Sequence, residues 1–381
     1  MYDLIIVGGG PAGSSAGREA GKRGLKVLLL EKEEFPRHKP CGGALSEPAL
    51  SYLDFELPAS IREREIFGVR LCHGNSVIER CKEKRIATMV SRGAFDHYLL
   101  EKGRETGIDI AIGERVLQIQ EKNDCIEVHT DGGCYHARYG IIAEGSQGRL
   151  KESVRRRDRK HEYGICVATE IEASEEAIEI RMNRVMEVHF GVLPMGYGWI
   201  FPHDTYYSVG IGAFADRASD LKTVMKDFLK RNDFTGPCRL QGHIVPAGGI
   251  KRTFVGSRVL LAGDAAGFVD PFAGEGIAYA IRSGRIAASV VDHCIRTDHR
   301  GDGLEVYERL CHDAFIRNFT YALMAARIMN RFPRFFFGIL TNNADVVDKF
   351  AEIPVLKRRY LTFMQWLVPR LPLYLPSLLR R

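Results

Sequence analysis

The stretch Leu4-Ile5-Ile6-Val7-Gly8-Gly9-Gly10-Pro11-Ala12-Gly13 decides the fold of this chain, because it joins an apolar strand to a glycine-rich turn. Gly8, Gly10 and Gly13 fit the G-x-G-x-x-G spacing of a dinucleotide-binding turn. Glycine is needed there because the backbone bends sharply and comes close to a pyrophosphate, whose charge rests on helix amides. The pattern predicts a Rossmann-like α/β domain.

The residues after the turn complete the same unit. A helix over roughly residues 12–23 leads through Gly24 into a second apolar strand at 26–30, which ends at Glu31. A carboxylate at this point accepts hydrogen bonds from ribose hydroxyls and disfavours a 2′-phosphate, so we do not expect NADP as the resident nucleotide.

A second nucleotide contact lies far along the chain. The apolar run Val259 to Ala262 leads to Asp264, placing this carboxylate at the sheet edge where α/β folds bind ligands. Gly274 and Gly276 let the chain pass close to a flat ring, and a helix from 277 to about 291 directs its positive end at that ring. Two such contacts in one chain predict FAD held along its whole length.

Two further motifs carry a family resemblance. These are Pro36-Arg37-His38-Lys39-Pro40-Cys41-Gly42-Gly43 and Tyr197-Gly198-Trp199-Ile200-Phe201-Pro202. With the glycine turn, Glu31 and Gly263-Asp264, the chain resembles the p-hydroxybenzoate hydroxylase flavoproteins, and the finer motifs resemble their geranylgeranyl reductase branch. The resemblance fades after roughly the first 300 residues.

The resemblance and the turn together give a set of expected FAD contacts. Arg92 stands at the start of an expected amphipathic helix at 91–107, where the resemblance implies a contact with FAD, and Val116 enters the set because its strand should lie beside the adenine. The expected contacts are Gly8, Gly10, Ala12, Gly13, Glu31, Cys41, Gly42, Ala44, Arg92, Val116, Asp264, Gly267, Gly276 and Ile277. Glu144 stands where the family usually has aspartate, so it is left out of the set.

The substrate side is expected in an inserted antiparallel sheet, because short alternating stretches run from Tyr163 to Phe214. Tyr197, Trp199 and Phe201 alternate and should share one sheet face, with glycines leaving the other face bare. This aromatic face is either the wall of a ligand cavity, together with Pro271, or a layer of the core.

The resemblance implies saturation of isolated carbon–carbon double bonds in a geranylgeranyl or longer polyprenyl chain. Such a reaction needs a hydride from flavin N5 and a proton for the other carbon. Cys41, Tyr197 and Trp199 are the expected catalytic residues. Cys41 has three open roles: proton donor, gate of the flavin pocket, or small filler beside the ring. Tyr197 and Trp199 are expected to shape the tunnel, where the tyrosine hydroxyl can assist protonation.

The same fold also supports an alternative function, an FAD-dependent monooxygenase of a hydrophobic substrate. A flavin-binding membrane scaffold without turnover is a third alternative. The external reductant, NADPH or a ferredoxin, stays open because the chain has no second dinucleotide turn.

The spread of the motifs predicts a discontinuous FAD domain at 1–60, 85–160 and 250–300 and a substrate domain at 61–84 and 161–249. Residues 301–381 are expected to be helical. Residues 363–379 are apolar but interrupted by Pro369, Pro372 and Pro376. This region is expected either to lie on a membrane surface or to form a lid or dimer contact.

The amino-acid composition indicates the general class of protein to which the chain belongs. The chain is 45% hydrophobic and 27% charged, which is typical of a globular protein. Its nine cysteines form no C-x-x-C pair, so we expect free thiols and no metal site. Without a basic start to the chain we expect no signal peptide and a cytoplasmic protein, with the inner membrane face as a peripheral site.

The net charge of +6 is unevenly distributed. Residues 155–161 hold five arginines or lysines. This run is either a solvated loop or a docking site for an anionic headgroup or an acidic electron carrier. Nucleic acid is not an expected partner, because no aromatic residues are interleaved with the charges.

Overall fold

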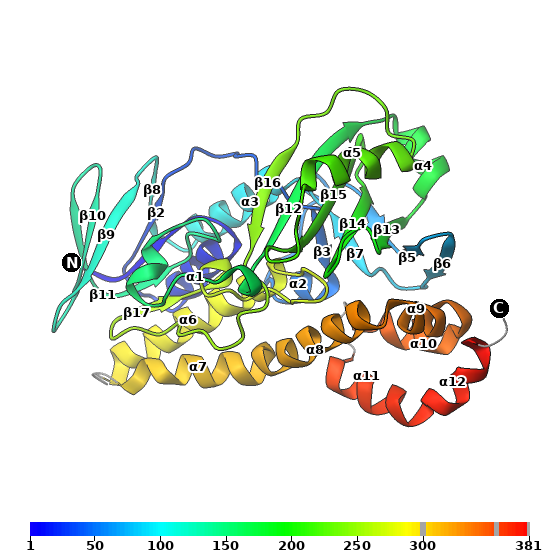
Figure 1. The fold of residues 1–381 in the computed structure, drawn as a ribbon. Coiled ribbons are helices and arrows are strands. Elements are labelled where there is room, and N and C mark those ends of the chain that lie inside the picture. The colour runs from blue at the N-terminus through cyan, green and yellow to red at the C-terminus, as the bar shows by residue number, and fades with distance from the viewer. Residues whose placement is uncertain (298–301, 354–357, 379–381) are drawn as a thin grey trace.

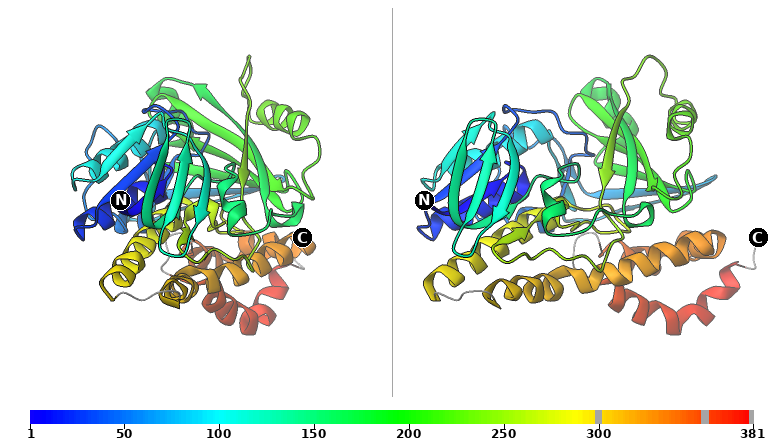
Figure 2. Two further views of the ribbon diagram at one scale, coloured as in Figure 1. Left: turned by 90° about the vertical axis from the view of Figure 1, so that its left-hand side faces the viewer. Right: turned by 60° about the vertical axis from the view of Figure 1, so that its left-hand side comes forward.

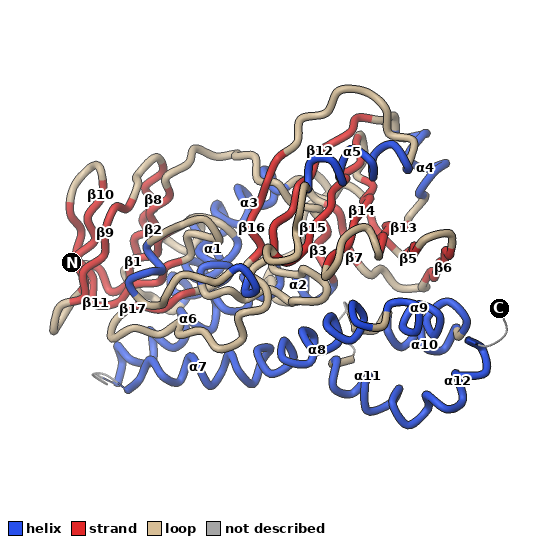
Figure 3. The backbone as a smooth tube through the Cα atoms, viewed as in Figure 1, coloured by secondary structure: helices blue, strands red, loops and turns tan. Residues whose placement is uncertain are grey.

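The computed structural model describes residues 1–297, 302–353 and 358–378. It confirms the predicted fold class: a Rossmann-like sheet with helices, a second and mostly antiparallel sheet, and helices at the C-terminal end. Figure 3 shows the strands in two groups, with a long layer of helix running beneath both.

The first sheet has seven strands in the order β8-β2-β1-β11-β10-β9, with β17 also paired to β11. Its strands β8, β2, β1, β11 and β17 are parallel to one another, so their carboxyl ends meet at one edge. The bounds are β1 Tyr2–Val7, β2 Val27–Glu31, β8 Asp109–Ile112, β9 Val116–Glu121, β10 Ile126–Thr130, β11 Cys134–Ile142 and β17 Val259–Leu261.

Three helices pack on this sheet (Figure 1). They are α1 Pro11–Lys22, α3 Arg92–Arg104 and α6 Ile277–Thr297. The predicted amphipathic helix at 91–107 is α3, which buries Phe95, Leu99 and Leu100 as its spacing indicated. Helix α6 begins where predicted but continues six residues further than expected, and Asp292 and Cys294 are buried in this extension.

The second sheet has the strand order β16-β12-β15-β14-β13-β5-β6. Its pairs are antiparallel except that β13 runs parallel to β5. The bounds are β5 Gly68–His73, β6 Ser76–Cys81, β12 Gly164–Glu172, β13 Val185–Phe190, β14 Gly196–Pro202, β15 Tyr206–Phe214 and β16 Gln241–Val245. Strands β5 and β6 come from the segment predicted to join this sheet, residues 61–84.

Smaller elements connect and cover the two large sheets. A third sheet pairs β3 and β4 with β7. Their bounds are β3 Ala44–Ser46, β4 Glu65–Ile66 and β7 Ala87–Met89, and the short helices here and on the second sheet are α2 Glu47–Ser51, α4 Glu175–Met182 and α5 Leu221–Arg231.

The C-terminal third is helical. Helices α7 and α8 run from the first sheet toward the second, and the remaining helices gather below the second sheet (Figures 1 and 2). The bounds are α7 Glu305–Cys311, α8 Arg317–Arg331, α9 Pro333–Asn342, α10 Ala344–Phe350, α11 Tyr360–Leu367 and α12 Leu371–Leu378. Of the region predicted at 301–381, positions 301, 354–357 and 379–381 lie outside the described residues. No described helix has both the length and the apolar run needed to cross a bilayer.

One detail of the sequence analysis is wrong. The sheet face behind the aromatic residues of β14 is not bare, because Phe228 of α5 packs against Gly198. A Cβ added to Gly198 would lie 2.8 Å from the Phe228 ring, so the glycine makes room for a neighbouring helix.

The basic run at 155–161 is extensively paired. Arg155 is buried and forms an ion pair of 2.6 Å with Asp158, and Arg157 pairs with Glu152 at 3.0 Å. Arg156 pairs with Glu162, and this contact lowers the pKa of the Glu162 carboxyl to about 2. Three of the five cations thus already have acidic partners within the chain.

Candidate active site

The glycine turn joins β1 to α1 in a conformation that excludes side chains. Gly8 has φ +103°, and a Cβ on Gly13 would lie 1.8 Å from the Gly8 carbonyl oxygen. Gly10 is the N-cap of α1 and has no side chain, so it offers no side-chain acceptor to the amides of the first helical turn. Uncapped amides with a helix dipole behind them form a site for a phosphate group.

Glu31 lies at the end of β2 and is 5% exposed. One carboxylate oxygen accepts a hydrogen bond from the Gly9 amide at 2.6 Å, and the other accepts from the Glu33 amide at 2.9 Å. The carboxylate is therefore tied to the turn itself, where it borders the cavity described below.

Asp264 follows β17, at the same sheet edge as the glycine turn. The preceding Gly263 has φ +58°, and its amide donates to the Ser283 hydroxyl at 3.0 Å. The Asp264 side chain borders the cavity and accepts no hydrogen bond from the described residues. It is an acceptor available to a ligand hydroxyl.

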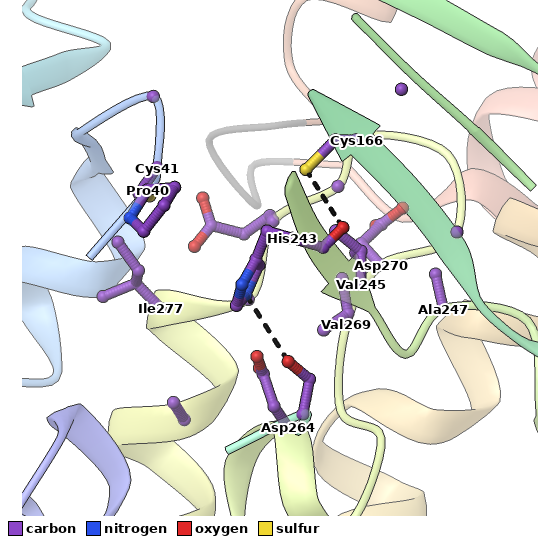
Figure 4. A pocket seen from close by; sticks show the side chains of 18 of the residues that line it. Pro40, Cys41, Cys166, His243, Val245, Ala247, Asp264, Val269, Asp270 and Ile277 are labelled. Carbon is purple, nitrogen blue, oxygen red and sulfur yellow. Dashed lines mark hydrogen bonds between the residues drawn. The ribbon is translucent and has the colours of Figure 1, made fainter. Parts of the chain in front are cut away.

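Figure 4 shows His243 of β16 directed toward Asp264. The His243 ring lies 3.5 Å from the Ser146 hydroxyl. Burial, with a smaller contribution from Lys39, lowers the pKa of His243 to about 4, so the ring is neutral near pH 7. The sequence analysis missed this residue, because β16 brings it from the second sheet to the edge of the first.

The segment with Cys41 and Gly42 is held by the second sheet. The His203 ring lies 3.1 Å from the Gly42 carbonyl, and its other nitrogen is hydrogen-bonded to Glu63. The Ser208 hydroxyl donates to the Cys41 carbonyl at 3.4 Å. His203, Ser208 and Glu63 were not predicted. The only sequence signal is that His203 directly follows the aromatic motif.

The aromatic side chains of β14 face the Cys41 segment. Trp199 donates from its indole nitrogen to Ser208 at 3.3 Å, and a Cβ on Gly42 would lie 2.8 Å from the Phe201 ring. Tyr197 donates its hydroxyl to the Ala273 carbonyl at 2.8 Å, and burial raises the pKa of that hydroxyl. All three side chains border the cavity, whereas the alternative was a closed core layer.

Two acids stand on the turn before α6, Asp270 buried and Glu275 half-buried, and the sequence analysis missed both. Asp270 accepts from the amides of Phe272 and Ala273 and from the Tyr360 hydroxyl at 3.2 Å. Glu275 accepts from the Ala278 amide at 2.9 Å. Burial raises the pKa of both carboxyl groups, which favours their protonated forms.

One cavity of about 1230 Å³ joins these parts. It extends from the glycine turn and Glu31, past Asp264 and the aromatic side chains, to apolar residues from the C-terminal helices. Those apolar residues are Ala326, Met329, Val347, Phe350 and Ile353. The helices therefore form part of the cavity wall.

The expected site residues that border this cavity are Gly8, Gly10, Ala12, Glu31, Cys41, Gly42, Ala44, Arg92, Val116, Tyr197, Trp199, Phe201, Asp264, Pro271, Gly276 and Ile277. Gly13 and Gly267 lie behind its surface. Gly13 faces the Gly8 carbonyl, and Gly267 has φ +82° and accepts from Arg252 at 3.2 Å. Glu144 borders the cavity as well, although its carboxylate accepts from the Lys151 amide at 2.8 Å. No cluster with the composition of a metal site occurs among the residues that the structure describes.

The chain belongs to the family described as FAD binding domain, which matches residues 1–320. The site fits this cofactor, because the uncapped helix, the ribose-side carboxylate and the unpaired Asp264 follow one another along a single cavity.

Several of the similar proteins are reductases, and the chain is an FAD-dependent oxidoreductase. It is 30% identical to the menaquinone reductase of Mycobacterium tuberculosis, over 87% of this chain and 85% of that one. It is 29% identical to digeranylgeranylglycerophospholipid reductase 2 of Methanosphaera stadtmanae, over 81% and 82%. The resemblance to geranylgeranyl reductases is thereby confirmed.

The solved structures agree on the fold. A geranylgeranyl bacteriochlorophyll reductase-like protein from Thermoplasma acidophilum superimposes with a TM-score of 0.78 at 24% identity, covering 97% of this chain and 98% of that one. The halogenase PltM, solved with FAD, has a TM-score of 0.70 at 17% identity, with coverage of 92% and 82%. At these identities the likeness shows the shared architecture.

Proposed function

We propose that this protein saturates carbon–carbon double bonds of a long polyprenyl chain in isoprenoid lipid synthesis. The observation that carries the proposal is the single cavity, which leads from the cofactor residues directly to an apolar end walled by α8 and α10. A long hydrocarbon has the right chemistry for that end, because it offers apolar area and few hydrogen bonds. The names of two relatives, a prenyl lipid reductase and a quinone reductase, support the same substrate class.

The reaction asks two things of the chain's own residues. When bound and reduced, the flavin supplies a hydride from N5. An isolated alkene is not polarised, so the protein must hold the double bond against the ring and provide a proton for the other carbon. Trp199, Phe201 and Pro271 supply apolar walls for the first task and help to exclude water.

Cys41 and Tyr197 are the two expected candidates for donating the proton to the second carbon of the double bond. The Tyr197 hydroxyl already donates to the Ala273 carbonyl, so we assign Tyr197 to shaping the tunnel and holding the turn before α6. The Cys41 sulfur lies 3.5 Å from the Gly43 amide, and its segment is fixed by the second sheet. We assign Cys41 to the flavin edge, as proton donor or gate. Glu275 offers a second proton source on the same cavity.

Lipid analysis tests the function directly. In the absence of oxygen, dithionite-reduced protein is expected to add two hydrogen atoms per double bond to geranylgeranyl lipids or quinone tails. Mass spectrometry of the lipids measures this gain in mass. Protein that is not reduced serves as the control and is expected to give no mass change. Gain of an oxygen atom, with a requirement for O₂, would instead identify the alternative monooxygenase.

We also propose that the C-terminal helices contact a membrane surface peripherally. Val368 and Leu373 are 56% and 73% exposed at the start of the last helical segment, and Arg370 lies between them in sequence. Exposed apolar side chains beside a cation match the boundary of an anionic bilayer.

Sedimentation with anionic liposomes tests this surface. The double variant Val368→Asp with Leu373→Asp is expected to lower bound protein about tenfold, because two apolar side chains are lost and two repulsive charges gained. Ile180→Asp, at another exposed apolar residue on α4, is the matched control and should sediment like the unaltered protein. Equal sedimentation of both variants would remove the membrane role.

We propose NADPH or an acidic ferredoxin-type carrier as the external reductant. Within the basic run, Arg159 and Lys160 form no ion pair among the described residues and are exposed. These two side chains are the ones available to an acidic carrier.

A further inference from the structure

Lys39 is a charged residue of the Pro36–Gly43 motif whose chemistry the proposed function leaves unused. Its side chain borders the cavity, and its electrostatic neighbours are Arg92, Asp264, Asp96 and Arg37. In the described parts of the chain, its ammonium group makes neither a hydrogen bond nor an ion pair within 4.0 Å. A cation in this position lacks a counter-anion.

The two neighbouring arginines already share one carboxylate. Arg92 binds both oxygens of the fully buried Asp96 at 2.9 Å, and Arg37 contacts the same carboxylate at 3.1 Å. The contacts of the Asp96 carboxylate are therefore taken up by the two arginines. Three cations face two acids in this cluster, so it carries a net positive charge.

The surroundings of Lys39 make its positive charge energetically unfavourable. Burial lowers the pKa of its ammonium, and the charge of Arg92 lowers it further. Asp264 and Asp96 oppose this shift, but the net direction stays downward. Buried charges in proteins are normally paired, and an anionic ligand would supply the missing partner.

The location of the cluster selects the kind of anion. The Arg37 guanidinium lies 3.4 Å from the position that a Cβ on Gly10 would take. Gly10 is the uncapped start of α1, a helix of twelve residues, and such a terminus favours phosphate. The cations and the helix amides thus face one part of the cavity from two sides.

We propose that the Lys39 ammonium binds the pyrophosphate of FAD, as the one cation of the cluster that makes no ion pair with Asp96. The proposal rests on the cofactor and is independent of the prenyl substrate. A pyrophosphate carries its charge in every redox state of the flavin, so Lys39 acts on affinity rather than on redox potential. Arg37 and Arg92, held by Asp96, form the rigid wall beside it.

Flavin titrations of the apoprotein test this role without any turnover. Lys39→Met is expected to raise the FAD dissociation constant about tenfold or more, because a charge-assisted contact is lost. Riboflavin, which lacks phosphate, should bind Lys39→Met and the unaltered protein within about twofold of each other. Lys39→Arg keeps the charge and is expected to restore most of the FAD affinity.

Two further measurements make the result specific. Lys160→Met removes an exposed lysine outside the cavity and should leave FAD affinity unchanged. The midpoint potential of FAD bound to Lys39→Met should match that of the unaltered protein. Unchanged FAD affinity in Lys39→Met would overturn the proposal. So would an equal loss for riboflavin, or a shifted potential with unchanged affinity, since each would place Lys39 at the ring. Failure of the lipid assay with intact FAD binding would affect only the proposed substrate.

Discussion

Gly13→Ala is expected to yield a colourless protein of lowered stability. The added Cβ would lie 1.8 Å from the Gly8 carbonyl oxygen, and this oxygen belongs to the backbone of the turn that must receive the pyrophosphate. To relieve this clash the turn must open or α1 must shift. Overpacking of this kind lowers the free energy of unfolding by about 3 kcal/mol. The shift also displaces the helix amides from the phosphate. Flavin absorbance after reconstitution and the thermal midpoint measure the two effects.

Gly17→Ala is the matched control, one turn further along α1. Its added Cβ would lie 2.7 Å from Cδ1 of Ile108, which is the end of a flexible side chain. Rotation of Ile108 relieves that contact, and alanine gains about 1 kcal/mol of helix propensity over glycine. We expect normal flavin content in this variant. Loss of flavin in Gly17→Ala to the same extent as in Gly13→Ala would show that general helix packing, and not the turn, controls binding.

The parts of the site that the sequence predicted depend on short-range patterns. The glycine turn and the strand leading to Asp264 each follow from spacing within about ten residues, and Glu31 follows from its place about 20 residues after the turn. The aromatic motif was placed on one strand by its alternation, and β14 has those bounds within a residue. Local periodicity and backbone stereochemistry are sufficient for such features.

The unpredicted residues reach the site through tertiary contacts. His203 contacts Gly42 and Glu63 only because the second sheet folds over the Cys41 segment. Asp270 and Tyr360 meet across 90 positions of sequence. No local period marks such pairs, since their partners are chosen by the packing of whole sheets and helices.

The C-terminal helices also show the difference between what local sequence predicts and what tertiary packing decides. Their apolar, proline-interrupted sequence was compatible with a membrane surface or with a lid. The structure adds that Met329, Val347 and Phe350 border the cavity, so the helices wall its apolar end whichever surface they also contact. Both roles are possible together, because α8 and α10 turn one side to the cavity while Val368 and Leu373 remain exposed.

Ala326→Phe is expected to shorten the channel and thereby change which substrates are reduced. Ala326 lies on α8, is 5% exposed and borders the apolar end of the cavity, so a phenyl ring there occupies space that the chain end needs. Burial of hydrocarbon contributes about 0.8 kcal/mol per methylene-sized group. Excluding one five-carbon isoprene unit removes about 4 kcal/mol at most, and we expect kcat/KM for a twenty-carbon chain to fall roughly 100-fold or more.

Shorter chains should escape this penalty, because they do not reach the blocked end. We expect reduction of a ten-carbon prenyl substrate to stay within about threefold of the unaltered protein, with flavin content unchanged. Met324→Phe places the same ring on the opposite side of α8, where the side chain is 40% exposed, and should alter neither substrate. A channel that ends elsewhere would leave the long-chain rate intact in Ala326→Phe, and an equal fall for both chain lengths would indicate distortion of the flavin site. Only a loss that grows with chain length fits a hydrocarbon extended from the aromatic residues of β14 to the C-terminal helices.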